Sequence, residues 1–80
     1  MQTVSKHDLT EREKEILRMV WAGYKYSEIA TILVIAESTV QSHMDMVRVR
    51  LDVRNNHQAT LVAYRRGIIH PHEVPVIETA

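Results

Sequence analysis

The chain has 80 residues, of which 45% are hydrophobic and 25% charged, with ten basic and ten acidic residues and no cysteine. This length supports one small domain with a single core, and the lack of cysteine excludes a disulfide framework and a thiolate metal site. No apolar run approaches the roughly 20 residues that span a bilayer, and the polar N-terminus lacks the apolar stretch of a signal peptide, so we expect a soluble, cytoplasmic protein.

The apolar spacing is helical along the chain, and no segment alternates with the period of two that a half-buried strand requires. The sequence therefore predicts an all-α fold of four helices. The first begins at Thr10, which forms a capping box with Glu13, and stops at Gly23. The second runs from about Tyr26 to Leu33.

The predicted third helix starts near Glu37 and has two opposite faces. The stripe that faces the core consists of Val40, Met44, Val47 and Leu51. The outward face carries Ser38, Gln41, Ser42, Asp45 and Val49. A short helix, a tight turn and this helix form a helix-turn-helix over about residues 23–45, which is a common way to present one helix to a DNA groove.

The predicted fourth helix starts at Asn55 or Asn56 and ends at Gly67, with Leu61 and Tyr64 away from its core stripe. The domain thus covers residues 9–69. Residues 1–8 are expected to form a short N-terminal segment, and residues 70–80, which contain both prolines, an extended tail.

Positive charge is concentrated in the second half of the chain, although the formal net charge is zero. Between Ser38 and Gly67, five arginines accompany two aspartates, which leaves an excess of three positive charges. This excess is modest for a protein that binds a polyanion, so we expect weak, salt-sensitive background binding to DNA.

Several short motifs occur in a fixed order along the chain. They are LTEREKEIL at positions 9–17, Gly23, Glu28-Ile29-Ala30, Glu37, Thr39-Val40, His43, Leu51-Asp52-Val53, Ala59 and Gly67-Ile68-Ile69. Their order and spacing resemble those of the LuxR/NarL/GerE-type helix-turn-helix domain. The resemblance implies a tetrahelical fold of the LuxR/GerE C-terminal effector type, whose third helix enters the major groove and whose fourth helix pairs two copies on an inverted repeat.

Candidate site residues follow from this placement. Base reading is assigned to Gln41, Ser42 and Asp45. Phosphate contacts are assigned to Lys25, Tyr26, Thr39, Arg48, Arg54, Asn56 and His57. Dimer contacts are assigned to Leu61, Tyr64 and Arg65. The expected partner is double-stranded DNA, and we expect no catalytic group, metal, cofactor or small-molecule ligand within this chain.

Five positions depart from the family pattern, and one of them is Trp21, which stands where relatives usually carry a smaller residue and is expected to be a core or rim side chain. Gln41 and Asp45 stand where relatives commonly carry Lys or Arg, and Asp45 either accepts from a cytosine amine or is a solvated surface residue. Lys25 and Ala36 stand where relatives tend to carry a capping Ser or Thr, so either the helices start one or two residues later or the domain is less stable.

The leading hypothesis is a dimeric bacterial transcriptional regulator, either stand-alone or the effector domain of a longer protein. The zero net charge and Asp45 also permit an antiactivator that forms heterodimers with a full-length LuxR-type protein. A relative of the promoter-reading region of sigma factors, which shares this fold, is a third hypothesis and requires RNA polymerase as its partner.

Overall fold

The computed structural model describes residues 8–70, which form four α-helices and no strand. The helices are α1 (Glu11–Trp21), α2 (Tyr26–Leu33), α3 (Glu37–Leu51) and α4 (Asn56–Arg65). This confirms the predicted all-α fold. Of the predicted N-terminal segment and tail, only Asp8 and His70 lie within the described residues. Over residues 8–70, no helix is both long and apolar enough to cross a membrane.

The start of α1 shows the predicted capping box. The Thr10 hydroxyl accepts from the backbone N–H of Glu13 at 3.1 Å, and the Glu13 carboxylate accepts from the backbone N–H of Thr10 at 2.9 Å. Two otherwise unpaired N–H groups are thereby satisfied. The helix stops before Gly23, whose φ of +98° suits a residue without a Cβ.

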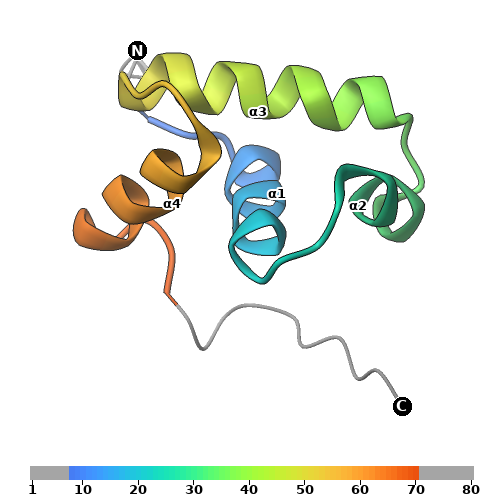
Figure 1. Ribbon diagram of the computed structural model, residues 1–80, viewed down its shortest axis with the longest axis horizontal. Helices are drawn as coiled ribbons and strands as arrows, with labels where there is room; N and C mark the ends of the chain where they lie inside the picture. The colour runs from blue at the N-terminus through green and yellow to red at the C-terminus, as the bar shows by residue number, and fades with distance from the viewer. Residues whose placement is uncertain (1–7, 71–80) are drawn as a thin grey trace, which may run out of the picture.

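The core lies where α3 crosses the other helices, and α3 packs against α1, α2 and α4 (Figure 1). Its core stripe is buried as predicted, with Val40, Met44 and Val47 at 0% exposure and Leu51 at 2%. Burial of each such side chain contributes about 1.5–3 kcal/mol. Position and tilt of α3 are therefore determined by the whole core.

The turn between α2 and α3 is short and includes an unusual backbone conformation. Val34 follows α2 with φ 58° and ψ 49°, in the left-handed region, and its side chain is 88% exposed. A β-branched residue is costly there, because its Cβ lies close to the carbonyl oxygen. The conformation still allows the Val34 N–H to bond to the last turn of α2.

The helices α2 and α3 begin without a side-chain cap. Lys25 and Ala36 hold the two N-cap positions, and neither side chain accepts a hydrogen bond from the helix. At α2 the Glu28 carboxylate accepts from the Lys25 backbone N–H at 2.7 Å, which is half of a capping box. The alternative of a later start is wrong, since the helices begin at Tyr26 and Glu37.

A buried ion pair joins α1 to α3. The Glu13 side chain, only 4% exposed, lies 3.4 Å (Oε1 to Nε) from Arg50, and Arg50 also donates to the Asp8 carbonyl at 3.1 Å. The sequence predicted only the capping role of Glu13. Its second role depends on the approach of α3, which no local pattern indicates.

Candidate nucleic-acid interface

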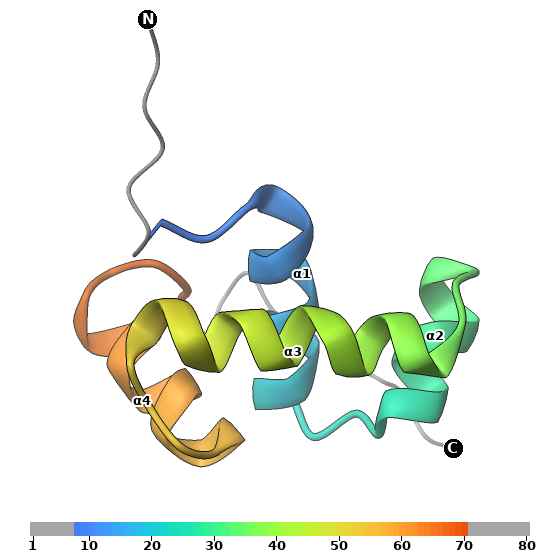
Figure 2. The ribbon, with the colours of Figure 1, turned by 90° about the horizontal axis from the view of Figure 1, so that it is seen from above.

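One long face of α3 is left uncovered by the rest of the domain. In Figure 2 this helix runs across the front of the described structure, and the other helices lie behind it or beside it. The residues exposed on it include the predicted outward set, which we call the reading face: Ser38, Gln41, Ser42, Asp45 and Val49. The helix packs on the core through its buried stripe and presents this face to solvent.

Apolar side chains also occur on this side of α3. Val49 is 70% exposed and Met46, one turn beyond Ser42, is 42% exposed. The helical pattern of the sequence places Val49 outward, and the spacing of Met46 from Ser42 indicates the same side for Met46, which was not among the predicted residues. Apolar groups at such positions can contact the methyl group of thymine.

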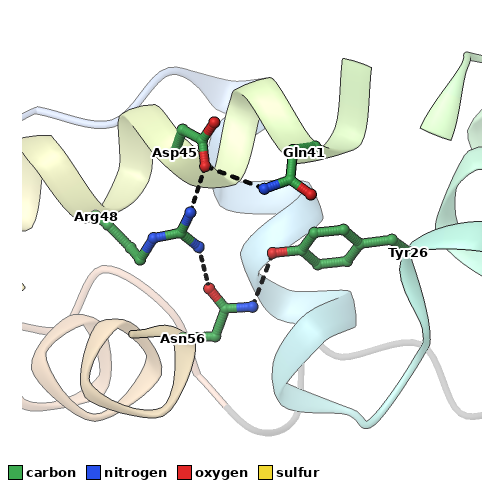
Figure 3. Close-up of polar contacts among 5 residues, drawn as sticks. All are labelled: Tyr26, Gln41, Asp45, Arg48 and Asn56. Atoms are coloured by element: carbon green, nitrogen blue, oxygen red, sulfur yellow. Dashed lines mark hydrogen bonds and ion pairs between the residues drawn. The ribbon is translucent and has the colours of Figure 1, made fainter. Parts of the chain in front are cut away.

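Five of the candidate residues form one polar network, drawn in Figure 3: Tyr26, Gln41, Asp45, Arg48 and Asn56. Gln41 donates to Asp45 at 3.3 Å, and Arg48 donates to the same Asp45 oxygen. Arg48 also donates to Asn56 at 2.5 Å, and Asn56 donates to the Tyr26 hydroxyl at 2.8 Å. The polar network thus ties the start of α2 and the start of α4 to the middle of α3.

Burial differs along this polar network. The Asp45 side chain is 54% exposed, whereas that of Arg48 is 21% exposed. Asn56 and Tyr26 are half-buried between the helices. Asp45 therefore has a third role beyond the two that the sequence left open, because it holds Gln41 and Arg48 in place and neutralises part of the positive charge.

The remaining phosphate candidates lie outside the polar network and are exposed. Lys25 precedes α2, Thr39 lies in the first turn of α3, and His57 lies in the first turn of α4. Arg54 lies in the turn between α3 and α4, where its backbone N–H donates to Gln58 at 2.9 Å. Helix N-termini carry partial positive charge, so the starts of α2, α3 and α4 all favour anions.

The dimer candidates lie on the exposed side of α4. Leu61 is 39% exposed and Tyr64 is 50% exposed, and Arg65 is also exposed. The Tyr64 ring packs against Trp21 of α1, with ring centroids 5.4 Å apart and planes tilted by 55°. Tyr64 therefore has an intramolecular contact as well as an exposed edge, and Trp21 is a residue at the rim of the core.

Acidic and histidine side chains do not cluster in the described part of the chain. Within residues 8–70, no group of three or more histidine or acidic side chains is placed to hold a metal ion. The buried acid, Glu13, is engaged by the α1 cap and by Arg50.

Comparison with known proteins relates this chain to bacterial regulatory proteins. Residues 7–63 match the family model described as bacterial regulatory proteins, luxR family. The response regulator protein VraR of Staphylococcus aureus is 38% identical over 61 residues, which cover 76% of this chain and 29% of VraR, and VraR of Staphylococcus epidermidis matches equally well. The chain therefore spans less than a third of the length of these relatives.

A solved structure shows the same fold. The crystal structure of the response regulator ChrA, from a heme-sensing two-component system, superposes with a TM-score of 0.74 at 32% sequence identity. The match covers 78% of this chain and 31% of ChrA.

Proposed function

Because the chain belongs to the luxR family of bacterial regulatory proteins, we propose that it binds duplex DNA in a sequence-specific manner and acts, without catalysis or a cofactor, as a transcriptional regulator. The observation that carries this proposal is the division of α3 into two faces. Its core stripe is fully buried, while the reading face is open along the length of the helix. An α-helix presented in this way fits the major groove.

The proposed docking places the start of α3 at the base edges. Gln41, Ser42 and Asp45 then meet bases, and the starts of α2 and α4, which lie beside each other, meet the adjacent phosphates. Lys25, Tyr26, Thr39, Arg48, Arg54, Asn56 and His57 supply the phosphate contacts. The exposed positions of Lys25, Thr39, Arg54 and His57 support this docking, as do the contacts that hold the starts of α2 and α4 beside α3.

Two copies are proposed to bind an inverted repeat through α4. The exposed Leu61, the exposed edge of Tyr64 and the neighbouring Arg65 support this contact. As a regulator of bacterial genes the protein acts in the cytoplasm, where the DNA is. The relatives named above are response regulators, and this chain is proposed to serve as the DNA-binding module of such a regulator or as a small regulator by itself.

Affinity for a pool of random duplex DNA, measured across a salt series and followed by rounds of selection, tests the proposal. We expect the logarithm of the affinity to fall linearly with the logarithm of the salt concentration. We also expect selection to enrich an inverted repeat that two protomers bind. Absence of binding at about 50 mM salt, by a chain shown to be folded, would overturn the proposal.

A second candidate function is that of an interaction module that forms heterodimers with a full-length LuxR-type protein. One observation favours it: Asp45 engages Arg48 and so reduces the positive charge beside the reading face. The double substitution Gln41→Ala, Ser42→Ala separates the two functions. It should abolish regulation if the protein reads DNA and leave regulation intact if the protein acts by heterodimerisation.

A further inference from the structure

The two charged members of the polar network, Asp45 and Arg48, determine which groups donate and which accept along it. A carboxylate can only accept hydrogen bonds and a guanidinium can only donate them. Arg48 donates to Asp45 and to the Asn56 side-chain oxygen, which forces the Asn56 amino group toward Tyr26. The Tyr26 oxygen therefore accepts, and its hydroxyl hydrogen remains available to a phosphate oxygen.

The same constraint sets the orientation of the Gln41 amide. Because Asp45 offers no hydrogen, Gln41 must turn its amino group toward the carboxylate, at 3.3 Å from Nε2 to Oδ1. Figure 3 shows the Gln41 carbonyl oxygen pointing away from Asp45. One N–H of the amide is used, so one acceptor and one N–H remain for a base.

An acceptor and a donor on one amide match the major-groove edge of adenine, which offers the N6 amine and the N7 acceptor. Guanine instead offers two acceptors, N7 and O6. Reading guanine through both N7 and O6 would require two N–H donors from Gln41, of which Asp45 already holds one, and would bring two acceptor atoms close to the Asp45 carboxylate. Arg48, whose side chain type suits guanine best, is turned between Asp45 and Asn56.

We infer that Asp45 is a specificity-determining residue that orients Gln41, so that the domain selects adenine and rejects guanine at the base pair facing Gln41. This inference rests on the proposed function, because it presumes that α3 lies in the major groove. Asp45 acts here as a positioning residue, and Gln41 makes the base contact.

The test compares selected DNA sequences and measured affinities for the parent chain and three variants. Gln41→Ala identifies the relevant base pair as the one whose preference disappears. Asp45→Ala frees the Gln41 amide and Arg48. Asp52→Asn is the matched control, because it removes the same charge near the end of α3 from an exposed residue that no contact shown here joins to the polar network.

We expect the parent to favour adenine over guanine at that base pair by roughly tenfold. Asp45→Ala should reduce this ratio to near one, while Asp52→Asn should leave it unchanged even though both variants bind DNA more tightly overall. Thermal unfolding of each variant checks that the fold is retained.

Each other outcome overturns a specific statement. If Asp45→Ala keeps the adenine preference, or if the parent favours guanine or no base at the Gln41-dependent position, Asp45 does not set specificity, although DNA binding stands. If Asp45→Ala and Asp52→Asn reduce the preference for adenine equally, the loss of negative charge explains the effect and Asp45 does not position Gln41. If the folded parent binds no DNA, the proposed function itself fails and the inference fails with it.

Discussion

The Tyr26 hydroxyl stands at the end of the polar network, where it accepts from Asn56 and keeps its own hydrogen for an outside acceptor. A neutral donor adds affinity for phosphate without releasing a counterion. Its neighbour Lys25 is exposed and charged, so substitutions of these two residues test the proposed phosphate contacts through different physical effects.

Substitution Tyr26→Phe should weaken DNA binding by about 0.5–1.5 kcal/mol, uniformly across sequences, and leave the slope of log affinity against log salt unchanged. Lys25→Ala should weaken binding and lower that slope by about one. Titrations at several salt concentrations measure both. A slope that changes for Tyr26→Phe, or stays constant for Lys25→Ala, contradicts the proposed phosphate contacts.

Val34 offers a test of backbone strain. Its backbone lies in the left-handed region, and its side chain is 88% exposed and so contributes little packing. Val34→Asn should stabilise the domain by about 1 kcal/mol, since Asn tolerates this conformation and little packing is lost. For a domain of this size that corresponds to a melting temperature higher by about 4–8 °C. Asp52→Asn is the control, because Asp52 has the same φ of 58° and aspartate tolerates this conformation about as well as asparagine does. The melting temperature of the Asp52→Asn variant should therefore barely differ from that of the parent.

At the scale of the helices, α4 has a side-chain hydrogen bond at its N-terminal cap and α3 has none. Asn55 caps α4 by accepting from the Gln58 backbone N–H at 2.8 Å, whereas Ala36 offers α3 no acceptor. The backbone of Ala36, at φ −72° and ψ 149°, already has the extended conformation that capping residues adopt. The start of the helix proposed to read DNA therefore lacks a stabilising contact that its geometry could accommodate.

Substitution Ala36→Ser should accordingly stabilise the domain by about 1 kcal/mol, and Asn55→Ala should destabilise it by a similar amount. Chemical denaturation of the three chains measures both changes. An Ala36→Ser variant no more stable than the parent would show that the start of α3 is satisfied by other means.

At the scale of the whole molecule, the proposed dimerisation would use apolar groups that one copy leaves exposed. Leu61 on α4 is 39% exposed and Ile32 on α2 is 50% exposed, so the two make a matched pair on different helices. Leu61→Arg should reduce affinity for an inverted repeat on the order of tenfold to a hundredfold, which is a usual range for coupling between two sites. Affinity for a single half-site should stay unchanged, because one copy binds it alone.

Ile32→Arg should leave the preference for the inverted repeat over a half-site intact. Both variants should keep the parent's helical content, because each changed side chain is exposed. If Leu61→Arg retains full cooperativity on the inverted repeat, the dimer contact lies elsewhere than α4.

The sequence by itself determined the number of helices, their bounds to within about two residues, and the family. Helical periodicity marked Val40, Met44, Val47 and Leu51 as one buried stripe, and local capping chemistry marked Thr10 as the start of α1. These features depend on neighbours within one or two turns of helix, which the order of residues specifies directly.

Only the tertiary structure decided which distant side chains meet. The polar network joins Tyr26 to Asn56 and through Arg48 to Asp45, Glu13 is buried beside Arg50, and Tyr64 packs on Trp21. The sequence named most of these residues but assigned none of these contacts, and their roles toward DNA remain predictions. The physical reason is that such contacts depend on how the helices cross, and the packing of the entire core sets that geometry.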